Sequence, residues 1–218
     1  MPKRPKKRTY DSSGRKAAAE ATRHAILEAA RRVFLKHGYA GATMPAIAQE
    51  AGIALDTVYA VAGKKPALMR LLVETAISGQ DQAVPAEQRD YVRAIRAEPD
   101  AAAKLKIYAT ALAAIQSRLA FIFTVLQAAA TQEPDLQALW QEISRRRAAN
   151  MRLLAEDLAA TGQTRRDLSL SQIADIIWSM NAPEYFLLLV GQRGWTAEAF
   201  GRWLGDAWAR LLLENGGR

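Results

Sequence analysis

The chain has 218 residues, half of them hydrophobic, which is enough for one large or two modest globular domains. It contains no cysteine, which excludes a disulfide framework and a thiolate metal site and agrees with a reducing cytoplasm. The longest uninterrupted apolar run, residues 185–190, is far too short to cross a bilayer, so we expect no membrane span and no signal peptide.

Positive charge is concentrated at the N-terminal end. Residues 1–70 carry 14 Lys and Arg against 5 Asp and Glu, whereas the remaining residues carry 16 against 17. A general solubility bias would have spread the charge along the chain. Its concentration in one segment predicts that this segment neutralises the phosphates of a nucleic acid.

Two N-terminal segments precede the motif at residues 43–62. Residues 1–15 combine cations, proline and glycine with almost no apolar content, which predicts a disordered arm. This arm either inserts into a minor groove or is a solvated tail that raises the local DNA concentration. Residues 16–37 then carry an apolar stripe at helical spacing, and Gly38 closes this helix.

Residues 43–62 have the pattern of a helix-turn-helix. Thr43 is a suitable N-cap, Pro45 lies in the first turn, and Gly52 ends the first helix. A second short helix, predicted for residues 55–60, can bury only one face. Four of its side chains are therefore expected to be free to meet DNA: Leu55, Asp56, Thr57 and Tyr59.

Together with Ile26–Ala30, Val33–Phe34 and Gly38–Tyr39, this motif resembles the TetR family of transcriptional regulators. It is most similar to the branch with a TVYAxxGxKPxL recognition-helix motif, here beginning at Thr57. The resemblance implies that residues at the positions of Thr43, Tyr59 and Lys65 touch phosphates, and that Leu55, Asp56 and Thr57 face bases. Lys64 and Lys65 also lie at the positive end of the next predicted helix, where they would favour an anion.

The sequence departs from the family pattern at two places. Ala54 stands where the family usually has a serine that caps the recognition helix. Asp56 therefore either caps its own helix or accepts a hydrogen bond from a cytosine amino group. Val61 and Ala62 stand where most members have a histidine and a phenylalanine that pack this helix.

The rest of the chain predicts helices and no strand. Pro66 opens a helix to about Ser78, and residues 78–85 are the expected boundary between a DNA-binding domain at 16–80 and a second domain at 81–218. We expect an all-α fold of about nine to eleven helices, the second domain being a helical bundle for ligand binding and dimerisation. Its further predicted helices are one over residues 105–119, one carrying Phe121, Ile122 and Leu126, one from Pro134 to Gly162, one after Ser169, one after a break at Pro183, and one from Thr196.

The family resemblance implies an effector pocket inside this bundle. Polar and aromatic residues on apolar helix faces are the candidates for its wall, although each alone is better explained as a core residue or a satisfied structural hydrogen bond. The predicted pocket residues are Tyr108, Phe123, Gln127, Asn150, Trp178 and Asn181.

The last helix has a wide aromatic stripe that either packs inside the chain or against a second copy. The resemblance favours a homodimer built from the final two long helices. The predicted interface residues are Ile177, Leu188, Phe200, Trp203, Leu204, Trp208 and Leu211.

Enzyme chemistry is poorly supported by the sequence. The only histidines, His24 and His37, lie about 20 Å apart on one predicted helix and cannot share a metal ion. We find no phosphate-binding glycine loop and no nucleophile motif. We therefore expect no cofactor, no metal and no catalytic residue.

The function predicted from these features is that of a cytoplasmic, ligand-responsive repressor. As a homodimer it would bind a palindromic operator in double-stranded DNA, and a small-molecule effector would release it. One alternative is a constitutive or architectural DNA-binding protein without an effector. A remote alternative is a helical small-molecule carrier or enzyme that has acquired a helix-turn-helix.

Overall fold

The structure is a computed structural model, and it describes residues 12–80 and 82–214. Ten α-helices occupy most of these residues, and no strand occurs among them, which confirms the predicted all-α fold. The basic arm, residues 1–15, lies almost wholly outside the described residues, so its role stays a prediction.

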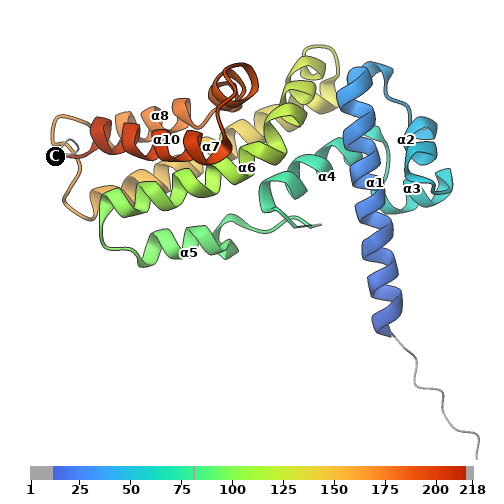
Figure 1. Cartoon of the computed structure of the whole chain (residues 1–218), viewed down its shortest axis with the longest axis horizontal. Coiled ribbons are helices and arrows are strands. Elements are labelled where there is room, and N and C mark those ends of the chain that lie inside the picture. The colour runs from blue at the N-terminus through green and yellow to red at the C-terminus, as the bar shows by residue number, and fades with distance from the viewer. Residues whose placement is uncertain (1–11, 81, 215–218) are drawn as a thin grey trace, which may run out of the picture.

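Four helices form the N-terminal part. Helix α1, Ser12–Gly41, changes direction at Gly38, whose φ of 66° lies in the left-handed region that glycine adopts without strain. Helices α2, Met44–Ala51, and α3, Leu55–Ala62, pack beside α1 at one end of the molecule (Figure 1). Helix α4, Lys65–Ser78, leads from there into the bundle.

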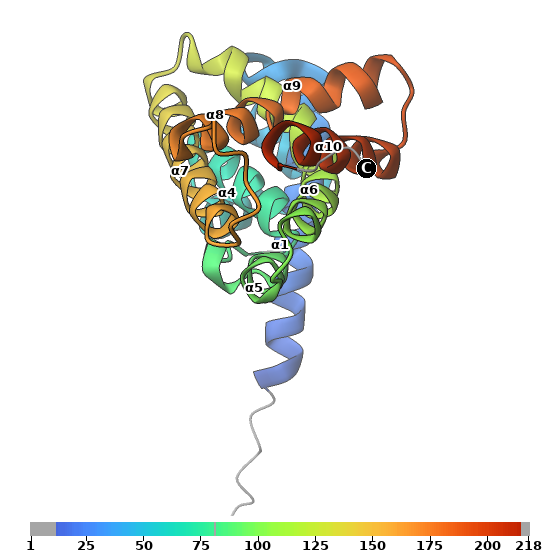
Figure 2. The same ribbon diagram turned by 90° about the vertical axis from the view of Figure 1, so that its left-hand side faces the viewer.

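The remaining helices form an elongated bundle. Figure 2 shows α7 and α8 on one side of it and α6 and α10 on the other. The elements are a 3-10 turn at Ala86–Gln88, α5 at Asp90–Ala97, α6 at Ala101–Ala130, α7 at Pro134–Ala159, α8 at Leu170–Met180, α9 at Pro183–Phe186 continued by a wider helical turn at Leu187–Gln192, and α10 at Ala197–Leu212.

Two helix predictions were wrong. Helix α6 is one continuous helix of 30 residues, where the sequence analysis placed two. Its buried hydrophobic residues up to Ala113 belong to one core cluster and most of those from Ile115 on to another, but no glycine or proline interrupts the helix. Helix α5 was not predicted, because its 8 residues bury only Ile95 and so carry little periodic signal.

Helix α6 is the central helix of the molecule. It is long and apolar enough to cross a membrane by length and composition, and the bent pair of α8 with residues 183–192 passes the same test when taken together. In the most apolar part of α6, however, 56% of the residues are buried inside the protein. Helices α4, α5, α7 and α10 all pack against it, so its hydropathy is explained by its place in the core.

The hydrophobic core continues across the predicted domain boundary. One cluster joins buried residues of α1–α4, such as Phe34 and Met69, to buried residues of α6 and α7, such as Ile122 and Leu139. Helices α1–α4 are therefore packed directly on the bundle. A second cluster fills the space between α5, α6, α7, α8 and α10.

Helix α10 packs against α6 through small residues. Gly201 and Gly205 face Ala109 and Ala113, and a β-carbon added at Gly201 would lie 3.2 Å from that of Ala113 and 3.3 Å from the carbonyl oxygen of Ala109. The absence of side chains at these glycines lets the two helices approach closely.

This packing corrects part of the predicted dimer interface. Four of the seven predicted residues are completely buried within the single chain, because α10 inserts its aromatic stripe toward α6 and α8 packs on α7. These four are Ile177, Phe200, Leu204 and Trp208. Their side chains have no surface to offer to a partner, whereas Leu188, Trp203 and Leu211 are at least partly exposed.

Candidate functional site

The helix-turn-helix is held by the local signals that the sequence predicts. The Oγ1 atom of Thr43 accepts a hydrogen bond of 3.2 Å from the backbone N–H of Ala46 and so caps α2. Gly52 ends α2 with a φ of 66°, and its N–H donates to the carbonyl of Gln49. Thr43 is thus a cap, and the residue remains exposed.

Helix α3 buries one face and exposes the other. Val58 is completely buried, while Asp56, Thr57 and Tyr59 are exposed and Leu55 is half-buried. The structure therefore brings the four predicted contact residues of α3 onto one short helix with polar groups facing outward. Contact with DNA itself stays a prediction.

The N-terminus of α3 has no side-chain cap. Ala54 offers none, and the carboxylate of Asp56 makes no hydrogen bond or ion pair with any described residue. Asp56 therefore does not cap its own helix in the structure. Its carboxylate lies near the positive end of the helix dipole, free to accept from an outside donor.

Lys65 is held inside the protein by its own neighbours. Its Nζ atom donates to the carbonyl oxygens of Tyr39, at 3.0 Å, and Ala42, at 3.1 Å, and lies 4.2 Å from the centre of the Tyr39 ring. An ammonium group has three N–H donors, so one remains without a hydrogen-bond acceptor among the described residues. Lys64, in contrast, is exposed.

Helix α4 is tied to the bundle by charged groups. Arg70 donates two hydrogen bonds, of 2.9 and 2.7 Å, to the carboxylate of Glu142 on α7. Glu74, whose side chain is only 13% exposed, accepts a 2.8 Å bond from Arg146 of α7. Arg118 of α6 donates to the carbonyl of Ala76 near the end of α4.

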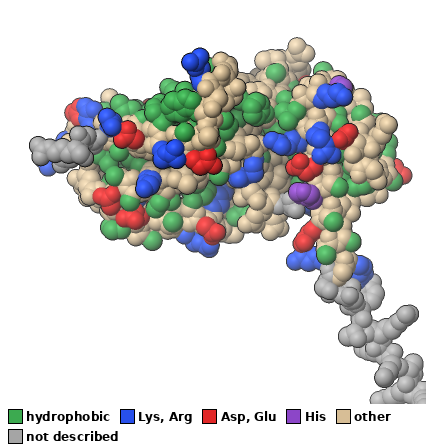
Figure 3. All heavy atoms as spheres, viewed as in Figure 1, with side chains coloured by type: hydrophobic (Ala, Val, Ile, Leu, Met, Phe, Trp, Pro, Cys, Tyr) green, Lys and Arg blue, Asp and Glu red, His purple; other side chains and the backbone are tan. Residues whose placement is uncertain are grey.

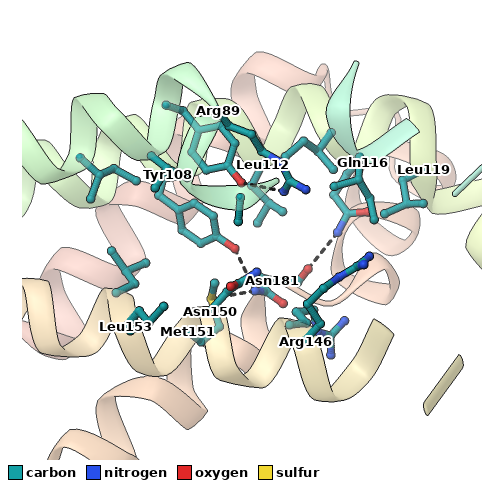
Figure 4. Close-up of a pocket in the computed structure, with 18 of the residues that line it drawn as sticks. Arg89, Tyr108, Leu112, Gln116, Leu119, Arg146, Asn150, Met151, Leu153 and Asn181 are labelled. Carbon is teal, nitrogen blue, oxygen red and sulfur yellow. Dashed lines mark hydrogen bonds between the residues drawn. The ribbon is translucent and has the colours of Figure 1, made fainter. Parts of the chain in front are cut away.

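A cavity of about 200 Å³ lies between α5, α6 and α7. In Figure 4, Tyr108, Leu112, Gln116 and Leu119 project from α6 toward Asn150 and Met151 of α7, with Asn181 between them. Most of the wall is apolar, and exposed Leu153 and Arg96 mark the side on which the cavity reaches the surface. This arrangement is typical of a small-molecule site.

Three buried polar residues form the inner end of the cavity. The amide nitrogen of Asn181 donates to the hydroxyl of Tyr108 at 3.0 Å, and that of Gln116 donates to the backbone carbonyl of Asn181 at 2.8 Å. The side-chain oxygens of Gln116 and Asn181 are buried without a partner among the described residues. Burial raises the pKa of Tyr108, so its phenol stays neutral and keeps its proton.

Two neighbouring arginines of α7 contribute to the wall, and they are bound differently. Arg146 pairs with Glu74 as described above. Arg147 stacks its guanidinium over the ring of Trp178, 4.6 Å from the ring centre, and its Nε is buried without a partner. Burial lowers the pKa of Arg147, and no carboxylate pairs with it among the described residues.

The structure brings four of the six residues predicted for an effector pocket together, and ligand binding there stays a prediction. Tyr108, Phe123, Asn150 and Asn181 line the cavity. Gln127 does not, because it lies on the exposed face of α6, and Trp178 stands behind Arg147 rather than in the wall.

Sequence reasoning missed the charged part of the wall. Arg146 and Arg147 precede the predicted Asn150 by four and three residues, the spacing that places side chains on one helix face. Gln116 lies eight residues after Tyr108 and so shares its face of α6. Helical spacing from the residues already chosen could have found all three.

Comparisons with known proteins agree with this geometry. Residues 26–72 match the family model described as "Bacterial regulatory proteins, tetR family". No curated protein sequence matches the chain.

Several solved structures share the whole fold. NalD of Pseudomonas aeruginosa, described as the secondary repressor of the MexAB-OprM multidrug efflux pump, is 18% identical with a TM-score of 0.69, covering 92% of this chain and 100% of its own. FadR of Bacillus subtilis, solved with stearoyl-CoA, is 16% identical with a TM-score of 0.67, covering 85% and 96%. A transcriptional regulator from Saccharomonospora viridis, solved with choline, is 19% identical with a TM-score of 0.64, covering 88% and 98%.

At these identities the structural likeness establishes the fold. Residues 26–72 thus form a tetR-family N-terminal domain, carried by a chain with the all-helical fold of TetR-family regulators.

Proposed function

We propose that this protein is a cytoplasmic, ligand-responsive transcriptional repressor that binds a palindromic operator as a homodimer. The observation that carries the proposal is the exposed polar face of α3, presented by a tetR-type helix-turn-helix within the only strongly basic part of the chain. Two such helices would enter successive major grooves roughly 34 to 36 Å apart. The match to the TVYAxxGxKPxL branch rests on residues 57–68 alone and belongs to this proposal.

DNA binding is tested by selecting operators from random duplex DNA with the full chain and measuring affinity at several salt concentrations. Lys64→Ala should weaken binding to all sequences and lower the salt slope by about 0.9, the loss of one phosphate contact. Thr57→Val should instead change the preference among sequences. Lys106→Ala, at an exposed site on α6, is the matched control. Equal losses on every sequence for the Thr57 and Lys64 variants would contradict these roles.

Lys65 needs a separate experiment because its ammonium also supports the fold. Lys65→Ala is expected to weaken DNA binding and also to destabilise the junction of α1 and α4, where two hydrogen bonds are lost. The free energy of unfolding, measured without DNA, gives the contribution of Lys65 to stability. An Ala variant that loses stability but no affinity would remove Lys65 from the DNA interface.

The homodimer is supported by apolar side chains left exposed on the C-terminal part. Figure 3 shows hydrophobic side chains gathered on the face that includes α8 and α10. Leu188 is 51% exposed and Leu211 42% exposed. Leu188→Asp and Leu211→Asp should therefore shift the chain toward monomer in analytical ultracentrifugation. Leu35→Asp, at a 42% exposed site on α1, serves as the control.

The cavity supports the ligand-responsive part of the proposal. Helix α4 connects the bundle that holds this cavity to the helix-turn-helix. Glu74 of α4 is bound by Arg146, which lines the cavity, so a ligand that rearranges Arg146 would alter the position of α4. The ligand must bind the DNA-incompetent arrangement more tightly, since equal affinity would shift nothing. A constitutive DNA-binding protein is the second candidate, and DNA affinity that no cavity ligand changes would favour it.

A further inference from the structure

We infer that the ligand of this cavity is an apolar molecule with one carboxylate, and that Arg147 binds this carboxylate. The inference rests on the proposed function, because it names the chemical class of the effector. It goes beyond that proposal by assigning a charge, a binding residue and an approximate size.

Arg147 is the observation that indicates an anion. Its guanidinium lies in the cavity wall, is desolvated enough to lower its pKa although the charge of Glu184 partly offsets this, and forms no ion pair with any described residue. Partly buried charges are normally paired, because burial without a partner is costly. The other face of the guanidinium is covered by the Trp178 ring, so the cavity is the direction left for a counter-ion.

Arg146 and Arg89 are less suited than Arg147 to bind a carboxylate. Arg146 is already neutralised by Glu74 at 2.8 Å and lies 4.0 Å from Glu142. Arg89 donates to the carbonyl oxygen of Val84, so its guanidinium is also partly occupied. Arg96 is exposed to solvent, so Arg147 is the partly buried cavity arginine with the most unused hydrogen-bonding capacity.

Tyr108 supplies a second donor for the same anion. Its hydroxyl oxygen accepts from Asn181, and its own proton has no acceptor among the described residues. Arg147 and Arg89 both place positive charge near this hydroxyl. A carboxylate at this point would accept from Tyr108 and Arg147, as charge-assisted hydrogen bonds require. Gln116 and Asn181 also line the cavity, and their side-chain oxygens are buried without a partner among the described residues.

The remaining wall and the volume define the rest of the ligand. Leu112, Leu119, Phe123 and Ile143 are apolar and buried, so the body of the ligand must be apolar. An apolar cavity of about 150 Å³ is known to hold benzene. A cavity of about 200 Å³ therefore has room for a ring with a short acidic chain, or for a medium-length alkyl acid.

The test compares acids with their neutral amides, which have nearly the same shape. Binding of 3-phenylpropanoate, 3-phenylpropanamide, octanoate and octanamide to the full chain is measured by calorimetry without DNA. We expect each acid to bind at one site per chain and about tenfold to hundredfold more tightly than its amide, the usual effect of a charge-assisted hydrogen bond. Arg147→Met should abolish this preference, and Tyr108→Phe should reduce it.

Two further variants make the result specific. Arg145→Met removes an exposed arginine next to Arg146 and should leave the preference for acids unchanged. Arg147→Lys keeps the positive charge and should retain part of the preference, which separates a binding role from a folding role. Amides that bind as tightly as acids, acids that do not bind, or an Arg147→Met protein that still prefers acids would each overturn the inference. Because DNA is absent, failure here is distinct from failure of the proposed DNA binding.

Discussion

Two helix contacts in this molecule are built in opposite ways. Helix α10 meets α6 through closely packed glycine and alanine, whereas α4 meets α7 through the ion pairs of Arg70 with Glu142 and Arg146 with Glu74. Close apolar packing has essentially one favourable arrangement, because any shift opens a void or creates a clash. Ion pairs near a cavity can exchange partners. The contrast teaches that the bundle is rigid where α10 meets α6 and more adjustable where α4 meets α7, although α1–α4 also share an apolar core with α6.

The largest expected effect comes from disturbing the rigid contact. Gly201→Val should lower the free energy of unfolding by about 3 kcal/mol, because its β-carbon already meets Ala113 and the backbone of Ala109. Gly205→Ala is the control. Its β-carbon would make ordinary contacts of 3.4 and 3.5 Å, and alanine favours a helix by about 1 kcal/mol over glycine. Urea unfolding of both variants measures the difference, and equal stability would mean that the helices can move apart.

The ion pair of Arg146 with Glu74, which lies nearer to the cavity, should have a smaller effect on stability. A double-mutant cycle with Glu74→Gln and Arg146→Met should give a coupling free energy of about 1 kcal/mol, since Glu74 is mostly buried but Arg146 is 40% exposed. The same variants should change the response of DNA binding to a cavity ligand. A Glu74→Gln protein with unaltered coupling between ligand and DNA would exclude this pair from the transmission route.

The ion pair of Arg70 with Glu142 should have the smallest effect on stability, and this effect should depend on pH. Arg70 and Glu142 are 45% and 42% exposed, so we expect about 0.5 kcal/mol. The hydrogen bond from Arg70 lowers the pKa of Glu142 below 4.5 in the folded state. The contribution is therefore complete above pH 4.5 and is lost as the pH falls through the lowered pKa. Unfolding of the wild type and Glu142→Gln over a series of pH values from 7 downward measures it, and a stability difference that does not shrink as the pH falls would contradict this origin.

Sequence reasoning succeeded where structure is determined locally. The Thr43 cap, the Gly52 turn and the alternation of buried Val58 with exposed neighbours all depend on residues within a few positions of one another. It failed for the aromatic stripe of α10, because Trp208 would show the same spacing whether it packed inside the chain or against a second copy.

The polar wall of the cavity was predicted only in part for a related reason. Tyr108 and Asn181 were recognised as polar residues on apolar faces, and they do meet. The stacking of Arg147 on Trp178 joins α7 to α8, and the pairing of Arg146 with Glu74 joins α7 to α4. Such partners are set by tertiary packing, which one-dimensional spacing does not encode.

The internal hydrogen bonds of Lys65 have a consequence for the thermodynamics of DNA recognition. A free lysine loses up to about 2 kcal/mol of rotamer entropy when a binding partner immobilises it. Lys65 has already lost most of this freedom during folding, because Tyr39 and Ala42 hold its ammonium in one position. If its remaining N–H meets a phosphate as predicted, that contact would form with little further ordering, so this lysine would be preorganised for DNA in a way that exposed Lys64 is not.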